Sequence, residues 1–209
     1  MTFLKKPAAV KRLLLCTAAV CLMGFCVSWL DFVNLGTDPG SCMNLGLSQL
    51  FGMSFGNWSA LFYSVLFVVV LLLDRSQLGI GTLLNMFLVG YACDFMTWLR
   101  QTFWPGLAVD GLVPRLLIMA AALVVFVVCA AVYISVDMGT APYDAFSLIL
   151  AEKLPQFSFR SVRIVYDCVV VLVGFLAGAT VGVATVLVAL TMGPAAEFVG
   201  KKIKPRLGL

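Results

Sequence analysis

Residues 36–41 read Gly-Thr-Asp-Pro-Gly-Ser, and residues 139–144 read Gly-Thr-Ala-Pro-Tyr-Asp, an offset of 103 positions. A Ser-Phe pair at 54–55 returns at 158–159, an offset of 104. The offset then goes back to 103, where Gly79, Thr82, Gly90, Ala92 and Phe95 match Gly182, Thr185, Gly193, Ala195 and Phe198. Because the match returns to one offset across separate blocks, the sequence predicts an internal duplication.

The composition of the chain predicts an integral membrane protein. Of 209 residues, 62% are hydrophobic and 11% are charged, and the mean hydropathy is +1.07. An ordinary soluble domain is about 45–50% apolar and about 25% charged. We therefore exclude a cytosolic enzyme, a nucleic-acid binder and a disordered chain, and we expect membrane lipids around the protein.

Each copy of the duplicated unit contains three apolar runs. A helix needs roughly 20 apolar residues to cross a bilayer, and six runs are predicted as spans: 13–33, 58–73, 78–98, 116–136, 162–178 and 181–199. The first run resembles a signal peptide, but it has a partner in the second copy. We therefore expect an all-α polytopic protein with a single transmembrane domain over 1–209, with repeat one at 11–99 and repeat two at 115–200.

An odd number of spans in each copy predicts that the second copy is inverted relative to the first. This 3+3 arrangement of inverted repeats is common among secondary transporters. Charge predicts the orientation, since twelve of the 14 lysine and arginine residues fall on the side of the two termini, with Arg100 and Arg115 on the other. By the positive-inside rule, both termini are cytoplasmic. We expect the bacterial cytoplasmic membrane.

After the first span of each copy, the chain is interrupted. The motif supplies a glycine for unusual backbone geometry, Thr37 and Thr140 as N-caps, with Asp38 as an alternative, and a proline for the first helical turn. The segments 39–50 and 142–153 that follow cover roughly 18 Å as helices, too short to cross. They are either re-entrant half-helices or interfacial helices lying flat. Small residues in the first segment favour re-entry.

Acidic residues inside the predicted spans need a partner or water. An acid at a helix centre costs on the order of 3 kcal/mol. Asp167 has Arg163 one helical turn earlier, whereas Asp94 has no basic neighbour in its span. We predict an inner polar cluster of Asp144, Arg163, Asp167 and Glu197, and an outer one of Ser41, Asp38, Tyr63, Asn85 and Asp94. These clusters either line a solute or proton pathway or form buried ion pairs that fix the helices.

The residues that are missing limit the chemistry. The chain contains no histidine, which removes histidine-ligated metals and Ser–His or Cys–His catalysis. It also contains no phosphate-binding motif of the ATPase type. We therefore expect no enzyme activity and no cofactor, and transport would be facilitated or ion-coupled unless a separate motor subunit exists. A helix start within the membrane would favour an anionic group of a solute.

Several motifs resemble the YczE/YyaS/YitT-type family of bacterial membrane proteins. They are Gly36 to Pro39, Ser54-Phe55, Leu78 to Thr82, and Gly90 to Asp94, and the resemblance covers about residues 10–200. It implies a membrane protein suspected at most of transport, and no substrate carries over. The two G-T-x-P motifs differ after the threonine, so we expect functionally unequal halves.

We predict a transporter or facilitator of a small polar or charged solute. The candidate substrate-binding residues are Thr37, Asp38, Ser41, Thr140, Tyr143 and Asp144, and the candidate coupling or pathway residues are Asp94, Arg163 and Asp167. The alternative is a non-transporting accessory protein that stabilises a membrane partner, which would have a dry, fully packed midplane. A third possibility is an intramembrane enzyme acting on lipids. A homo-oligomer is compatible with each.

Overall fold

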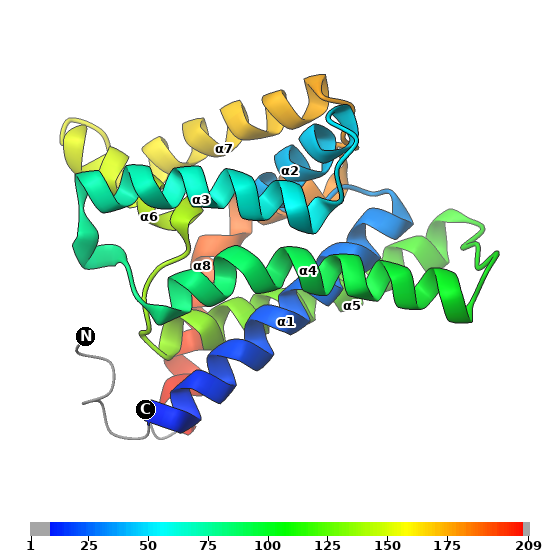
Figure 1. Ribbon diagram of the computed structural model, residues 1–209, viewed down its shortest axis with the longest axis horizontal. Helices are drawn as coiled ribbons and strands as arrows, with labels where there is room; N and C mark the ends of the chain where they lie inside the picture. Colours follow the sequence, from blue (N-terminus) through cyan, green and yellow to red (C-terminus); the bar gives the residue numbers. More distant parts are fainter. Residues whose placement is uncertain (1–8, 207–209) are drawn as a thin grey trace.

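The computed structural model describes residues 9–206, apart from the side chains of Pro194 and Glu197, and within this range the chain contains helices and no strand. The elements are α1 (Ala9–Val33), α2 (Pro39–Leu50), α3 (Phe55–Leu73), the short 3₁₀ helix η2 (Arg75–Gln77), α4 (Ile80–Phe103), α5 (Leu112–Ser135), α6 (Pro142–Lys153), α7 (Phe159–Leu176) and α8 (Val183–Arg206). Figure 1 shows the N-terminal end of α1 and the C-terminal end of α8 on one side of the molecule. We call α1 to α4 the first half and α5 to α8 the second half.

Four helices are long and apolar enough to cross a membrane: α1, α3, α4 and α5. A fifth span results if the two parts of α8, Val183–Gly193 and Phe198–Pro205, count as one, although they are bent by 59°. Helix α7 does not qualify, because it carries three charged residues within 18 positions. Large apolar side chains point outward along these helices, as with Leu72 and Leu176 at 80% and 76% exposure. Such a surface suits a lipid environment.

The helices pack in an arrangement that pairs the two halves. Helix α1 contacts both α4 and α5, and α5 in turn contacts α8. The short helix α2 packs against α3 and, more extensively, against α7 of the other half. The short helix α6 likewise packs against α7 and against α3. Figure 1 shows α1, α4 and α5 running along the length of the molecule, with α3 and α7 above them in this view.

Two arginines join α1 and α5 at their opposite ends. Arg12 Nη1 donates to the Val136 carbonyl oxygen over 2.7 Å, and Arg115 Nε donates to the Val33 carbonyl oxygen over 2.7 Å. Both partners of the second bond are related to those of the first by 103 positions. Each guanidinium thus satisfies a carbonyl at the C-terminal end of the other long helix, a position that favours positive charge.

The loops before the short helices bond to the other half through backbone atoms. Gly81 N donates to Met138 O over 2.8 Å, and Ala184 N donates to Leu35 O over 3.0 Å. These two bonds also correspond at an offset of 103. Gly139 has φ +111°, and a Cβ atom on it would lie only 2.5 Å from Gly79 N. Glycine is therefore required here both for its backbone conformation and for the close approach.

The two short helices have the bounds predicted for them, and each begins with proline. Their caps agree with the prediction in one case only. Asp38, the alternative cap predicted for the first segment, caps α2, where its side chain accepts a hydrogen bond from Ser41 N over 3.0 Å. Ala141 occupies the cap position of α6, without a side-chain bond. The prediction of Thr140 as a cap is wrong, because the residue after it takes the cap position.

We predict that Gly79→Ala destabilises the protein by about 1–3 kcal/mol, the usual cost of overpacking. A Cβ on Gly79 would collide with the Met138 backbone carbonyl oxygen, which cannot move without shifting the loop. The measurement is thermal unfolding of the purified protein in detergent. Gly193→Ala is the matched control, because a Cβ there meets nothing within 4 Å. Equal melting temperatures for the two variants would contradict the packing described here.

Candidate functional site

A cavity of about 680 Å³ lies between the N-terminal ends of α2 and α6. The first half contributes Asp38, Gly40 and Ser41 to its lining, and the second half contributes Thr140, Tyr143, Asp144, Arg163 and Asp167. Side chains from α3, α4, α5 and α8 complete the wall. Gln77 of η2 also lines it, so the cavity reaches the end of the molecule at which α3 connects to α4. The structure therefore brings five of the six predicted substrate-binding residues to one cavity.

An ion-pair network occupies the α6 side of this cavity. Arg163 Nη1 lies 2.7 Å from Asp144 Oδ1 and donates to Ser147 Oγ over 3.0 Å. Arg163 Nε lies 3.2 Å from the Asp167 carboxylate. The Tyr143 hydroxyl donates to Asp167 Oδ1 over 2.6 Å. The Asp167 side chain is 5% exposed, whereas that of Asp144 is 42% exposed, so the network extends from the protein interior to the cavity.

The α2 side of the cavity has polar atoms without partners. Asp38 Oδ2 accepts the cap bond, but Asp38 Oδ1 is buried and has no hydrogen-bond partner among the described residues. The buried Tyr133 hydroxyl on α5 likewise has none among them. A Cβ on Gly40 would lie 3.3 Å from the Tyr63 hydroxyl and 3.6 Å from Asp38 Oδ2. The backbone at Gly40 therefore packs closely beside two polar groups.

Equivalent positions of the two halves hold different side chains at the cavity. At offsets of 103 and 104, Asp144 corresponds to Ser41, Arg163 to Ser59, and Asp167 to Tyr63. The ion-pair network therefore has only hydroxyl groups at its equivalent positions in the first half. The sequence motifs indicated unequal halves, but they did not indicate which contacts would differ.

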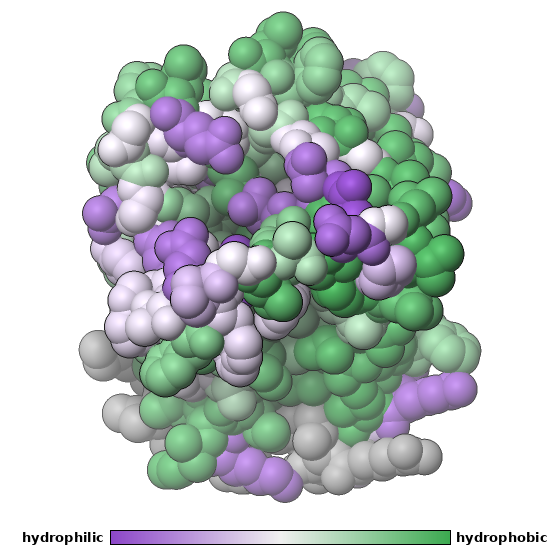
Figure 2. Space-filling model, turned by 90° about the vertical axis from the view of Figure 1, so that its right-hand side faces the viewer, coloured by the Kyte–Doolittle hydropathy of each residue, from purple (hydrophilic) through white to green (hydrophobic). Residues whose placement is uncertain are grey.

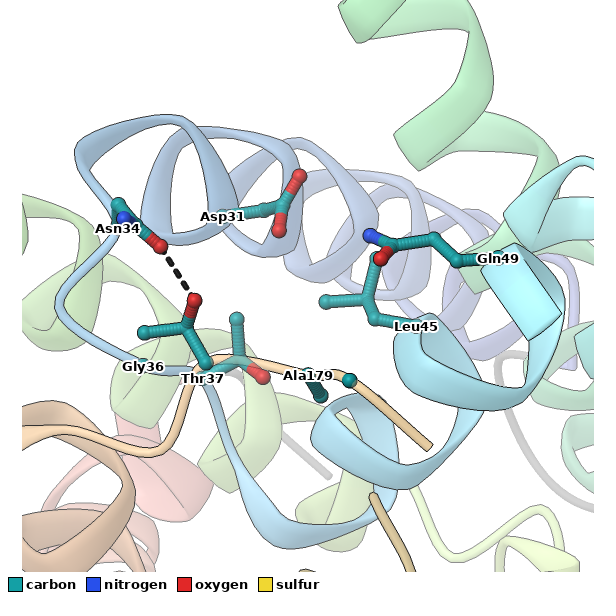
Figure 3. A pocket seen from close by; sticks show the side chains of 9 residues that line it. Asp31, Asn34, Gly36, Thr37, Leu45, Gln49 and Ala179 are labelled. Atoms are coloured by element: carbon teal, nitrogen blue, oxygen red, sulfur yellow. Dashed lines mark hydrogen bonds between the residues drawn. The ribbon is translucent and has the colours of Figure 1, made fainter. Parts of the chain in front are cut away.

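A second, smaller pocket of about 110 Å³ lies at the opposite end of the molecule. Its lining includes Asp31, Asn34, Thr37 and Gln49, shown in Figure 3. Thr37 therefore lies here rather than in the large cavity. The Thr180 hydroxyl donates to Asn34 Oδ1 and links the α1–α2 loop to the α7–α8 loop. Figure 2 views this end, where hydrophilic residues gather across the middle of the surface.

The predicted pathway residue Asp94 lies apart from both pockets. Its carboxylate accepts a hydrogen bond from Gly56 N over 2.9 Å and so joins α4 to the start of α3. The side chain of its counterpart Glu197 lies outside the described residues. Asn85 and Tyr63 do line the large cavity. Tyr133, which the sequence analysis missed, was marked only by a hydroxyl within an apolar run.

Comparison with known proteins places the chain among bacterial membrane proteins. Residues 10–201 match a family described as a family of unknown function, DUF6198. Uncharacterized membrane protein YczE of Bacillus subtilis is 25% identical over 182 residues, which cover 87% of this chain and 81% of YczE. Uncharacterized protein YyaS of the same organism is 24% identical over 155 residues, or 74% of this chain and 75% of YyaS.

An uncharacterized protein of Haemophilus influenzae is 25% identical over 191 residues, which cover 91% of this chain and 84% of that protein. The resemblance to YczE and YyaS predicted from the sequence motifs is confirmed by these matches. No solved structure matches the chain.

We predict that Arg163→Gln destabilises the protein by about 2–4 kcal/mol, because it leaves the buried Asp167 without its cation while solvent screens part of the loss. Replacing Asp144 and Asp167 by asparagine in the same variant should restore more than half of that stability, since no carboxylate then remains unpaired. Thermal unfolding in detergent measures both changes. Additive losses in the triple variant would show that the network does not act as a unit.

Proposed function

The chain belongs to the DUF6198 family, and we propose that it carries a small polar or charged solute across the bacterial cytoplasmic membrane. The observation that carries this proposal is the 680 Å³ cavity lined by charged residues at the starts of two short helices. Its size falls within the range of roughly 300–1,000 Å³ typical of small-molecule sites. Interrupted helices whose ends line a site between two repeats are characteristic of secondary transporters.

We further propose six membrane crossings, made by α1, α3, α4, α5, α7 and α8, in a 3+3 inverted repeat. The short helices α2 and α6 would then be re-entrant from opposite sides. Support comes from the contacts that recur at an offset of 103, such as Arg12 to Val136 and Arg115 to Val33. The three charged residues of α7 suit a helix that faces the cavity, because the Arg163 and Asp167 side chains contribute to its lining.

Within this topology the two pockets suggest a transport mechanism. The large cavity would open toward the cytoplasm, since it reaches η2 between α3 and α4. The 110 Å³ pocket lies at the opposite, outer end and is lined by Thr37, the counterpart of Thr140. The Asn34–Thr180 bond would hold this outer mouth closed. If each half adopted the conformation that the other half has in this structure, the inner mouth would close and the outer one would open.

The accessory-protein alternative predicts a different structure at the midplane of the membrane. A protein that only supports a partner needs no polar cavity, and a packed centre would be more stable than an open one. The described residues instead surround a cavity with an ionised network on one wall. This observation favours the transport proposal.

Ligand binding is the first test of the proposal. We predict that at least one member of a polar-metabolite set raises the melting temperature of the purified protein, by the equivalent of about 2.7 kcal/mol at a concentration of 100 Kd. Asp144→Asn and Thr140→Val should abolish this shift, because both side chains line the cavity. The exposed residues Asp110 and Thr191 offer the controls Asp110→Asn and Thr191→Val, which should retain it. If no compound of the set raised the melting temperature of the wild type, the result would favour the accessory role.

Topology gives a second test. We predict that green fluorescent protein fused to the C-terminus fluoresces in bacterial cells and that alkaline phosphatase fused there is inactive, because the basic residues near the ends of the chain hold them in the cytoplasm. A fusion of each reporter in the α4–α5 loop should give the reverse pattern. An active phosphatase at the C-terminus would refute the proposed orientation.

A further inference from the structure

We propose that the transported solute is a small organic cation that carries an ammonium group, bound between Asp38 and Tyr133. This inference rests on the proposed transport function and specifies the substrate class for the large cavity. It follows from the charges in the cavity, from its two unpartnered polar atoms and from its apolar walls.

The charge at the centre of the cavity is negative. Asp38, Asp144 and Asp167 line it, Asp137 lines it as well, and Arg163 is the one basic residue in the lining. The guanidinium of Arg163 is already engaged, through Nη1 with Asp144 and through Nε with Asp167. The network therefore presents no unshared cation to a solute, and Asp38 is left without a basic partner among these groups.

The helix ends do not reverse this balance. The N-terminus of α2 carries a partial positive charge, but the Asp38 carboxylate caps it. The first turn of α6 holds Asp144. A carboxylate thus lies at the start of each short helix, Asp38 as the cap of α2 and Asp144 in the first turn of α6, so both starts are unfavourable for the anionic solute group expected from the sequence. A cation at the same place would interact favourably with the carboxylates of Asp38, Asp144 and Asp167.

Two residues that line the cavity each have a buried polar atom without a partner. Among the described residues, neither Asp38 Oδ1 nor the hydroxyl of Tyr133, a residue that is 5% exposed, has a hydrogen-bond partner. A buried polar group without a partner is costly, so one is usually satisfied by water or by a ligand. An ammonium group donates several hydrogen bonds, so one bound beside Asp38 and Tyr133 would supply the donors that these oxygens lack.

Part of the remaining wall of the cavity is apolar. It includes Met23, Val89, Phe126, Val188 and Met192. A bare metal cation needs a shell of several oxygen ligands, whereas such walls suit the hydrocarbon part of an organic cation, with the polar groups fixing its orientation. The cavity volume also exceeds the needs of a single ion. An amine with an alkyl or aromatic portion fits this combination.

The test compares probes of equal size and different charge on the full-length protein in detergent. Butylammonium chloride, isobutylammonium chloride, sodium butyrate and butyramide are added at constant ionic strength, and binding is measured from the melting temperature. We expect at least one of the two ammonium probes to raise it and the butyrate and butyramide to leave it unchanged. Asp38→Asn should weaken ammonium binding about tenfold or more, and Tyr133→Phe should weaken it roughly three- to tenfold.

These variants keep the fold while they remove the proposed contacts. Asparagine caps a helix about as well as aspartate, so Asp38→Asn removes the charge and keeps the helix cap. Tyr133→Phe removes a hydroxyl that has no hydrogen-bond partner within the described part of the chain, so the melting temperature without ligand should not fall. The matched controls are Asp110→Asn and Tyr91→Phe, at exposed positions outside the cavity lining, and both should bind the ammonium probe as the wild type does.

Three results would overturn the inference. Stabilisation by butyrate but not by the ammonium probes would assign the site to anions and leave the transport proposal intact. Ammonium binding that persists unchanged in both Asp38→Asn and Tyr133→Phe would place the cation elsewhere. Silence toward both ammonium probes would exclude this solute class, and the polar-metabolite set would then decide separately whether the protein binds a solute at all.

Discussion

Backbone atoms at the two helix interruptions need hydrogen-bond partners, and this need constrains the rest of the structure. A carbonyl or amide without a partner cannot be left facing lipid. Each half supplies partners to the other, since Met138 O accepts from Gly81 N and Leu35 O accepts from Ala184 N. Glycines allow the loops to approach closely enough for these bonds. The short helices α2 and α6 are thereby held with their first turns at one cavity.

On this shared frame, the two halves have different roles. The second half provides the ionised network around Arg163, which is satisfied within the protein. The first half provides Asp38, whose Oδ1 has no hydrogen-bond partner among the described residues and is left as an acceptor for a solute. An evenly ionised pair of halves would add further buried charge at high cost. The two walls of the cavity therefore differ. The charged groups on the wall from the second half pair with one another, whereas Asp38 on the wall from the first half can bind a solute.

Much of the fold could be predicted from the sequence, because the duplicated units share short local motifs. Proline and glycine fix where α2 and α6 begin, and their bounds matched the prediction. The alternative cap Asp38 was confirmed, whereas Thr140 was wrong because Ala141 takes the N-cap position of α6. Asp94 was expected in a pathway, yet its carboxylate bonds Gly56 N. Tyr133 was missed because its lack of a partner depends on the packing of several helices, which a single sequence does not reveal.

The central claim is that the two equivalent loops face different compartments, with the inner one open and the outer one closed. Cysteine placed at Thr140 or at Thr37, in a background without the seven native cysteines, tests it through reaction with a membrane-impermeant maleimide applied to each side of oriented vesicles. The account predicts rapid labelling of Thr140→Cys from the cytoplasmic side alone and slow labelling of Thr37→Cys from the outer side alone. Failure of both cysteines to react from either side, or reaction of both from one side, would contradict it.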